Sequence, residues 1–369
     1  MKIRVIPQEL VKHISIAQRA ISTRTTINIL ECILFKAENS QLILTSTDLE
    51  LSIETRVPCE VIEEGSFVIS SDLIGSIFRK LPAHEAVLEA DNDVLNIDCL
   101  DSHFHLQVQN AKEYPPLIEI KDAKTTHIES DVLKRAVQET EFATSLDESK
   151  VALTGIYFER KEKEIRLVAL DGYRLAVRVI PLSDDEDEYS HSVIIPRRAM
   201  IELTRIFPDN IEISIHIIQG HVVFESENTK LYSRLIDKNY IRYEEIISTD
   251  FKTEVIVNRQ NLQNSFERAS LLVKEERANL IKLTFEDDFL HIESNSEIGH
   301  VNEQIAVEKT GDNLKIAFNA KYLLDGIRSL NTEKVHLFLN GTLNPLVVKP
   351  LGDENSYLYL VLPVRVGRD

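Results

Sequence analysis

The feature that most constrains the fold of this chain is a pattern that occurs three times along its 369 residues. Alternating apolar runs, interrupted by a short polar turn, begin at Leu42, Ile165 and Leu290, which lie 123 and 125 residues apart. Three times 123 residues equals the chain length. Because solenoid repeats span only about 20 to 50 residues, this longer period indicates an array of similar domains.

Each repeat is expected to contain two helices, because apolar residues recur at helical intervals in two windows per repeat. The six windows are 7–24, 72–80, 131–143, 197–206, 259–274 and 321–330. Segments such as VLNIDCL and FHLQVQ alternate between apolar and polar residues, as half-buried antiparallel strands do. The predicted fold class is α+β, with two helices packed on antiparallel sheets in each of three similar domains. Polar stretches suggest the domains 1–124, 125–249 and 250–369.

Composition excludes several classes of protein. No apolar run approaches the roughly 18 residues of a membrane helix, and the N-terminus lacks the apolar segment of a signal peptide, so we expect a cytoplasmic protein without membrane contact. Cys32, Cys59 and Cys99 are too far apart for a disulfide framework or a zinc site, and are expected to be buried or half-buried. We expect neither a metal nor a cofactor. The acidic run at 183–189 is expected to be a solvated loop.

Charge is distributed unevenly between the expected helices and the rest of the chain. The six windows hold 15 Lys and Arg against 8 Asp and Glu, or +7, whereas the remaining residues carry -25 within a total of -18. The total argues against a nucleic-acid partner, while the helix charge argues for one. The competing explanation is that bases simply favour helices. If the helices share one surface, it should attract DNA phosphates weakly and without sequence preference.

The tetrad Asp171-Gly172-Tyr173-Arg174 stands between two apolar runs. Asp-Gly between strands predicts a β-hairpin with a type I′ turn, in which both central residues have positive φ. The alternative is that the tetrad belongs to a catalytic site, in which case the protein would be a hydrolase that uses Asp48 and Asp171. Those two aspartates occupy equivalent turns of the repeat, and no His, Ser or Cys is spaced to assist them, so the hairpin is favoured.

The chain resembles the bacterial DNA polymerase III beta subunit, the sliding clamp, over essentially its whole length. The residues that carry the resemblance are TSTDLELSIETRV (45–57), ALDGYRLAV (169–177), SVIIPRRAMIELTRI (192–206), NPLVVKP (344–350) and YLYLVLPVRV (357–366). The resemblance implies the DNA clamp fold and a head-to-tail homodimer that closes into a ring of six domains. It also implies a non-enzymatic processivity factor that encircles double-stranded DNA and tethers the replicative polymerase subunit. The implied partners include the clamp loader complex and other replication and repair proteins with a short clamp-binding motif.

The resemblance further implies a pocket for partner peptides beside the tetrad. Its residues here would be Leu153, Leu170, Gly172, Tyr173, Arg174, Leu175, Ile241, Glu245, Ile246, Pro345, Leu360, Leu362, Pro363, Val364, Arg365 and Val366. Apolar walls would take leucine-like or aromatic anchors, and Arg174 and Arg365 would hold polar or acidic peptide groups at the rim. Ile241 replaces a proline that is usual in the family, and Glu245 replaces a common base. Ordinary strand packing is the alternative for the tail residues.

Two further surfaces follow from the resemblance. The DNA-facing residues would be Arg24, Lys150, Arg197 and Arg198. Tyrosines that touch DNA in some relatives fall on Val151 and Ala152, and Lys150 is the nearby cation that would compensate. The dimer interface would use Phe104, Leu106, Leu271 and Leu272, with core packing as the alternative.

Two rival interpretations stay open at this point. His103 and His105 flank Phe104 on one side of a strand, where they would either bind a metal or, as we favour, lie on a plain surface strand. The whole chain would otherwise be a peptide-binding scaffold without a DNA role, which the helix charge disfavours.

Overall fold

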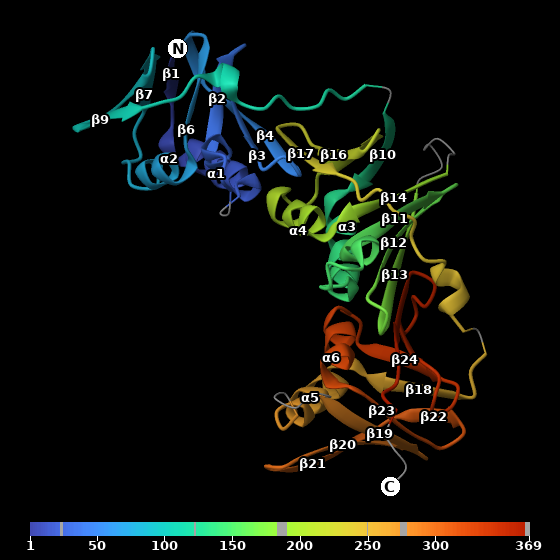
Figure 1. Cartoon of the computed structure of the whole chain (residues 1–369). Helices are drawn as coiled ribbons and strands as arrows, with labels where there is room; N and C mark the ends of the chain where they lie inside the picture. Colours follow the sequence, from blue (N-terminus) through green and yellow to red (C-terminus); the bar gives the residue numbers. More distant parts are fainter. Residues whose placement is uncertain (23–24, 122, 183–189, 249, 274–278, 366–369) are drawn as a thin grey trace. The chain divides into compact units, whose positions relative to one another are not determined.

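The computed structural model describes residues 1–22, 25–121, 123–182, 190–248, 250–273 and 279–365. It divides into two compact units, of which one comprises residues 1–131 and 198–235 and the other 132–197 and 236–369 (Figure 1). The second repeat of the sequence is therefore shared between the units. The acidic run 183–189, Arg24 and Val366 lie outside the described residues.

The first unit is built on two antiparallel sheets. The five-stranded sheet has the order β5-β1-β7-β8-β9, and the eight-stranded sheet has the order β10-β15-β16-β17-β4-β3-β2-β6. The strands of the smaller sheet are β1 (Lys2–Val5), β5 (Glu60–Glu63), β7 (Ala86–Asp91), β8 (Val94–Cys99) and β9 (Ser102–Gln107). Those of the larger sheet are β2 (Cys32–Glu38), β3 (Gln41–Thr47), β4 (Leu51–Pro58), β6 (Gly65–Ser70), β10 (Lys124–Glu129), β15 (Glu212–Ile218), β16 (His221–Glu225) and β17 (Thr229–Arg234).

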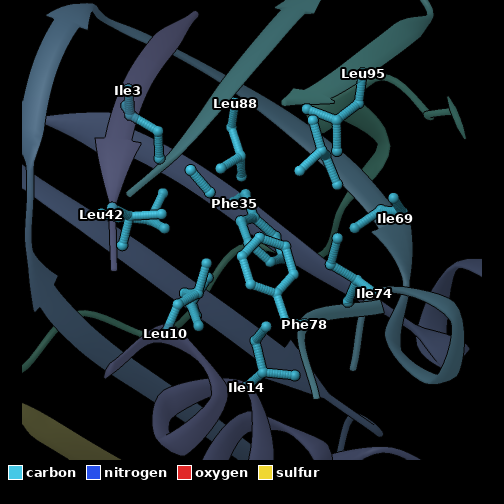
Figure 2. Close-up of a cluster of buried hydrophobic side chains, with 14 of the residues drawn as sticks. Ile3, Leu10, Ile14, Phe35, Leu42, Ile69, Ile74, Phe78, Leu88 and Leu95 are labelled. Atoms are coloured by element: carbon cyan, nitrogen blue, oxygen red, sulfur yellow. The ribbon is translucent and has the colours of Figure 1, made fainter. Parts of the chain in front are cut away.

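The core of the first repeat lies between these strands and helices α1 (Pro7–Ala17) and α2 (Ser71–Phe78) (Figure 2). Leu10 and Ile14 lie four residues apart on one face of α1, and Ile74 and Phe78 do the same on α2. These side chains gather around Phe35 of β2, as Figure 2 shows. Burying each such side chain contributes roughly 1.5–3 kcal/mol, so this packing fixes both helices on the sheet.

The second unit also contains two antiparallel sheets. The nine-stranded sheet has the order β14-β11-β12-β13-β26-β25-β24-β18-β22, and the four-stranded sheet has the order β21-β20-β19-β23. The strands of the larger sheet are β11 (Gly155–Lys161), β12 (Glu164–Leu170), β13 (Arg174–Pro181), β14 (His191–Pro196), β18 (Thr253–Asn258), β22 (Glu308–Gly311), β24 (Lys334–Leu339), β25 (Leu346–Pro350) and β26 (Tyr357–Val361). Those of the smaller sheet are β19 (Leu280–Glu286), β20 (Phe289–Ser296), β21 (Gly299–Ala306) and β23 (Leu314–Asn319).

In both large sheets a strand of one repeat pairs with a strand of the next. In the first unit β4 lies beside β17, with Ser52 opposite Tyr232. In the second unit β13 lies beside β26, with Leu175 opposite Leu360. Backbone hydrogen bonds therefore join successive repeats without a break in the sheet.

The remaining helices agree with the windows predicted from periodicity. They are α3 (Ser130–Thr140), α4 (Arg197–Ile206), α5 (Arg259–Ser270) and α6 (Ala320–Arg328). Asn258 and Asn319 cap α5 and α6, because their side chains accept hydrogen bonds from backbone N–H groups of the first turn. The first helix is shorter than predicted: it continues as a 3-10 helix (Gln18–Ala20) and then becomes extended at Ile21. The α+β class is confirmed, and within the described residues no helix is both long and apolar enough to cross a membrane.

Candidate functional site

The tetrad forms a tight turn between β12 and β13. The Asp171 N–H donates to the Arg174 carbonyl oxygen at 3.3 Å. The Oδ1 atom of Asp171 accepts from the N–H groups of Tyr173 at 2.8 Å and Arg174 at 3.1 Å. Gly172 has φ +98°, whereas neither neighbour in the turn has positive φ. The central residues are therefore Gly172 and Tyr173, and because only the first of them has positive φ, the turn has the pattern of type II′ and the type I′ prediction was wrong. Asp171 occupies the first position of the turn, where its side chain caps the backbone amides.

The equivalent turn of the first repeat is built in the same way. The Oδ1 atom of Asp48 accepts from the N–H groups of Glu50 at 3.0 Å and Leu51 at 2.7 Å. Its Oδ2 atom pairs with Arg198, just as Oδ2 of Asp171 pairs with Arg174. Both carboxylates are thus bound by backbone amides and one arginine, which is a structural role, and the geometry gives no support to the hydrolase alternative.

Arg174 lies inside the protein and not at a rim. Its side chain is 7% exposed. Nη1 donates to Oδ2 of Asp325 in α6 at 2.7 Å, and Nη2 donates to the carbonyl oxygen of Phe142 at 2.6 Å. The guanidinium carbon lies 4.5 Å from the centre of the Tyr322 ring. Since all three nitrogens donate within the chain, the expected role of Arg174 in holding peptide groups at the rim is not supported.

An apolar cluster covers one face of the sheet where β13 meets β26. We call it the joint cluster; its buried members are Leu153, Val168, Leu170, Leu175, Val177, Tyr243, Val347 and Leu360. Tyr157 and Tyr240 pack against it with their rings stacked 4.6 Å apart. Burial raises the pKa of Tyr240 and Tyr243 well above the usual range, so both phenols stay neutral. A cavity of about 200 Å³ opens beside Val177 and Tyr243.

Several predicted pocket residues surround this cluster with apolar surface exposed. Tyr173 is 57% exposed and Leu362 is 38% exposed, and the Leu362 N–H donates to the Tyr173 carbonyl oxygen at 2.8 Å. Pro345, Pro363 and Val364 are half-buried, and Arg365 is exposed. Leu360 is buried and Leu362 is not, so the tail supplies both core packing and open surface.

The segment that follows β17 contributes pocket residues other than those expected from the sequence. Ile241 and Ile246 are 46% and 40% exposed, and Glu245 is exposed beside Arg242. The connector residues that pack on the joint cluster are Tyr240, Tyr243 and Ile247. Sequence reasoning also missed Tyr322, whose ring stacks on Tyr173 at 6.1 Å. The sequence shows a tyrosine in the predicted helix 321–330, but no sequence pattern connects that helix with the tetrad.

The equivalent joint between the first two repeats carries polar side chains. A cavity of about 320 Å³ lies there, lined in part by Thr47, Ser52, Tyr232 and Arg234. By repeat spacing and strand register, these positions correspond to Leu170, Leu175, Leu360 and Leu362. The two joints share a backbone plan, but only the second has leucines at these positions to anchor apolar groups.

Two of the expected DNA-facing cations make ion pairs within their own units, and a third donates to a backbone oxygen. Arg197 pairs with Glu141 at 2.6 Å, and Arg198 pairs with Asp48. Lys150 donates to the Asp171 carbonyl oxygen at 3.4 Å. Other helix cations with acidic partners are Lys12, Arg19, Arg135, Arg205, Arg268 and Arg328. The charge count thus overstated the free positive charge, although exposed pairs contribute only about 0–1 kcal/mol each and phosphates can displace them.

Two of the expected interface residues lie on an edge strand, and the other two follow helix α5. Phe104 and Leu106 are half-buried on β9, an edge strand, where they pack against the core of the first repeat. Leu271 is 72% exposed directly after α5, and Leu272 is half-buried. Side chains His103 and His105 bond to Asp98 and Asn96, and the described residues contain no cluster that would hold a metal.

Comparison with known proteins covers the whole chain. Three family models match in succession: the N-terminal domain of the DNA polymerase III beta subunit at residues 1–118, its central domain at 127–241 and its C-terminal domain at 244–365. A beta sliding clamp of Bacillus subtilis is 34% identical over 99% of this chain and 100% of its own length.

Solved structures agree with the sequence comparison. The sliding clamp of Bacillus subtilis has a TM-score of 0.96 at 33% identity, with 99% of both chains covered. A sliding clamp of Pseudomonas aeruginosa bound to griselimycin has a TM-score of 0.94 at 27% identity, covering 99% of this chain and 100% of that one. The chain therefore belongs to the DNA polymerase III beta subunit family, and it is a three-domain sliding clamp that serves a DNA polymerase as a non-catalytic processivity factor.

Proposed function

We propose that two copies of the chain associate head to tail into a closed ring around duplex DNA, which a clamp loader opens in the bacterial cytoplasm. Strands β9 and β21 support this proposal, because each is the last strand of its sheet: among the described residues only one of its sides has a neighbouring strand, and its other side presents backbone N–H and C=O groups. Pairing β9 of one copy with β21 of the other would satisfy those groups. Phe104 and Leu106 would meet Leu271 and Leu272 beside the new strand pair.

The proposed domain boundaries are those expected from the repeat, at 1–124, 125–249 and 250–369. Strand β18 supports the second boundary, since it begins at Thr253 after a connector, and strand β10 begins at Lys124, one residue before the first boundary.

The proposed tethering site is the exposed surface over the joint cluster, which would receive a short peptide of the replicative polymerase or of other replication and repair proteins. The observation that carries this proposal is that buried leucines and the exposed Tyr173 and Leu362 adjoin at one sheet joint. The full proposed set, in which the buried Arg174 lies beneath the surface, is Leu153, Leu170, Gly172, Tyr173, Arg174, Leu175, Ile241, Glu245, Ile246, Pro345, Leu360, Leu362, Pro363, Val364, Arg365 and Val366. A clamp of this fold has been solved with griselimycin bound, and the proposal includes that griselimycin would occupy this same surface of the present chain.

The proposed DNA contacts are phosphate contacts by Arg24, Lys150, Arg197 and Arg198. Because the described pairs of Arg197 and Arg198 are partly exposed, phosphates would compete with Glu141 and Asp48 for these guanidinium groups. Binding of this kind falls steeply with salt and does not depend on sequence.

The decisive experiment loads the protein onto circular DNA and then linearises the DNA. A ring is retained on the circle and lost after cutting, whereas equal retention on both forms would refute topological binding. Phe104→Arg serves as the matched control, since it should open the edge contact while leaving every proposed phosphate contact in place. Light scattering should report a dimer for the unmodified chain and a monomer for this variant.

A further inference from the structure

Three elements of the second unit meet at one arginine side chain. Nε of Arg174 donates to Asp171 in the hairpin turn at 3.0 Å. Nη1 donates to Asp325 of α6, and Nη2 to the carbonyl oxygen of Phe142 in the 3-10 helix Glu141–Ala143. A planar guanidinium holds such a fixed fork of bonds, which the single ammonium of a lysine cannot reproduce.

The same guanidinium is connected to the exposed surface through aromatic rings. It lies 4.5 Å from the Tyr322 ring centre, and Tyr322 stacks on Tyr173 at 6.1 Å with 25° between the ring planes. The Tyr359 hydroxyl donates to the Tyr322 carbonyl oxygen at 2.7 Å, which fixes that part of α6. Tyr173 in turn accepts the Leu362 N–H. The position of the exposed Tyr173 and Leu362 therefore depends on contacts that lead back to Arg174.

We propose that Arg174 is a positioning residue, which sets the shape of the tethering surface by clipping the hairpin turn to helix α6 without itself touching the bound peptide. This inference rests on the proposed function of that surface. Arg174 then acts indirectly and does not recognise the peptide itself. Asp325 becomes equally necessary, although helix α6, to which it belongs, supplies none of the proposed peptide contacts.

The first test is a double-mutant cycle with griselimycin as the probe, read by calorimetry. Arg174→Ala and Asp325→Ala should each weaken binding on the order of tenfold, and the double variant should be no weaker than Arg174→Ala, because both changes break one clip. Arg174→Lys should fall between Arg174→Ala and the unmodified chain. Additive losses, or no loss from Asp325→Ala, would overturn the inference.

Arg178→Ala provides the matched control. Arg178 lies on the same strand with its side chain 12% exposed, and its ion pairs are with Glu139 at 3.3 Å and Asp353 at 3.8 Å. It should lower thermal stability while leaving griselimycin affinity unchanged. If Arg178→Ala lowered griselimycin affinity as much as Arg174→Ala does, the loss would not be specific to the contact between Arg174 and Asp325, and the proposal would be contradicted.

A second test measures tryptophan fluorescence, which is possible because the chain itself contains no tryptophan. Tyr173→Trp places a single reporter at the turn, and adding Asp325→Ala should shift its emission to the red as the ring leaves the Tyr322 stack. An emission wavelength that stays unchanged would contradict the clip.

Leu362→Ala separates the two proposals. If this variant binds griselimycin as the unmodified chain does, the proposed tethering surface is refuted, and the clip is refuted with it. If Leu362→Ala loses affinity while Asp325→Ala does not, only the clip fails.

Discussion

Replacing Gly326 by alanine tests how tightly helix α6 packs on strand β26. A Cβ atom at this position would overlap Cε1 and Cδ1 of the Tyr359 ring and lie 2.9 Å from its Cζ. Carbon atoms normally approach to about 3.5–4.0 Å. The ring cannot easily retreat, since Tyr359 is 1% exposed and its hydroxyl donates to the Tyr322 carbonyl oxygen.

Two opposing contributions decide the sign of the effect on stability. Alanine favours the helix over glycine by about 1 kcal/mol. Overpacking costs about 1–3 kcal/mol, and loss of the buried Tyr359 hydrogen bond costs about 1–3 kcal/mol more. The expected result of Gly326→Ala is a net loss of about 1–5 kcal/mol in the unfolding free energy of this region.

Hydrogen exchange of the amides of the substituted helix is the appropriate measurement, because a chain of three domains need not unfold in one step. The matched control is Gly75→Ala in α2, where a Cβ would meet only the ends of the Gln18 and Arg79 side chains at 2.6 and 3.1 Å. The end of Arg79 can move, whereas a shift of the Gln18 amide breaks its hydrogen bond to the Ser71 carbonyl oxygen, at a cost of about 0.5–1.5 kcal/mol. Since alanine gains about 1 kcal/mol of helix preference, the control should change stability by less than about 1 kcal/mol. Equal effects of the two variants, or faster exchange in the control, would refute the packing argument.

Three further predictions concern other parts of the chain. Burial lowers the pKa of His13, whose Nδ1 bonds to Thr55 at 2.7 Å, so its contribution to stability is present above the ordinary pKa of 6.5 and lost as the pH falls below it. His13→Asn should therefore narrow the difference in melting temperature between about pH 7.5 and about pH 5, and an unchanged difference would contradict this. Leu49 has φ +78° and is 49% exposed, so Leu49→Gly should raise stability by roughly 0.5–1 kcal/mol in a denaturant titration; a loss would show that its side-chain contacts outweigh the strain. Leu360→Ala should cost about 2–5 kcal/mol, since Leu360 is 2% exposed within the joint cluster, and a melting temperature equal to that of the unmodified chain would exclude this.

Sequence periodicity and turn chemistry predicted which helices and turns occur, but they did not predict the turn type or the contacts between distant residues. The helices were found because their apolar residues recur every three or four positions, a property that neighbours in sequence determine. The Asp-Gly pair likewise predicted a hairpin at the tetrad, yet the predicted turn type was wrong, because Asp171 is the first residue of the turn, where its side chain accepts from backbone amides, and is not a central residue. The leucines of the candidate site were named from a family resemblance, whereas Tyr322 and Asp325 were not named at all.

The sequence by itself determined the threefold repeat, the helix windows, the alternation of the strands and the turn at Gly172. Only the tertiary structure decided that Arg174 bonds to Asp325, 151 residues away, and that Arg198 bonds to Asp48, 150 residues away. It also decided that leucines line one joint while Thr47 and Ser52 line its counterpart. The physical reason is that periodicity and turn chemistry act within a few residues, while ion pairs and pockets depend on which strands pair across repeats.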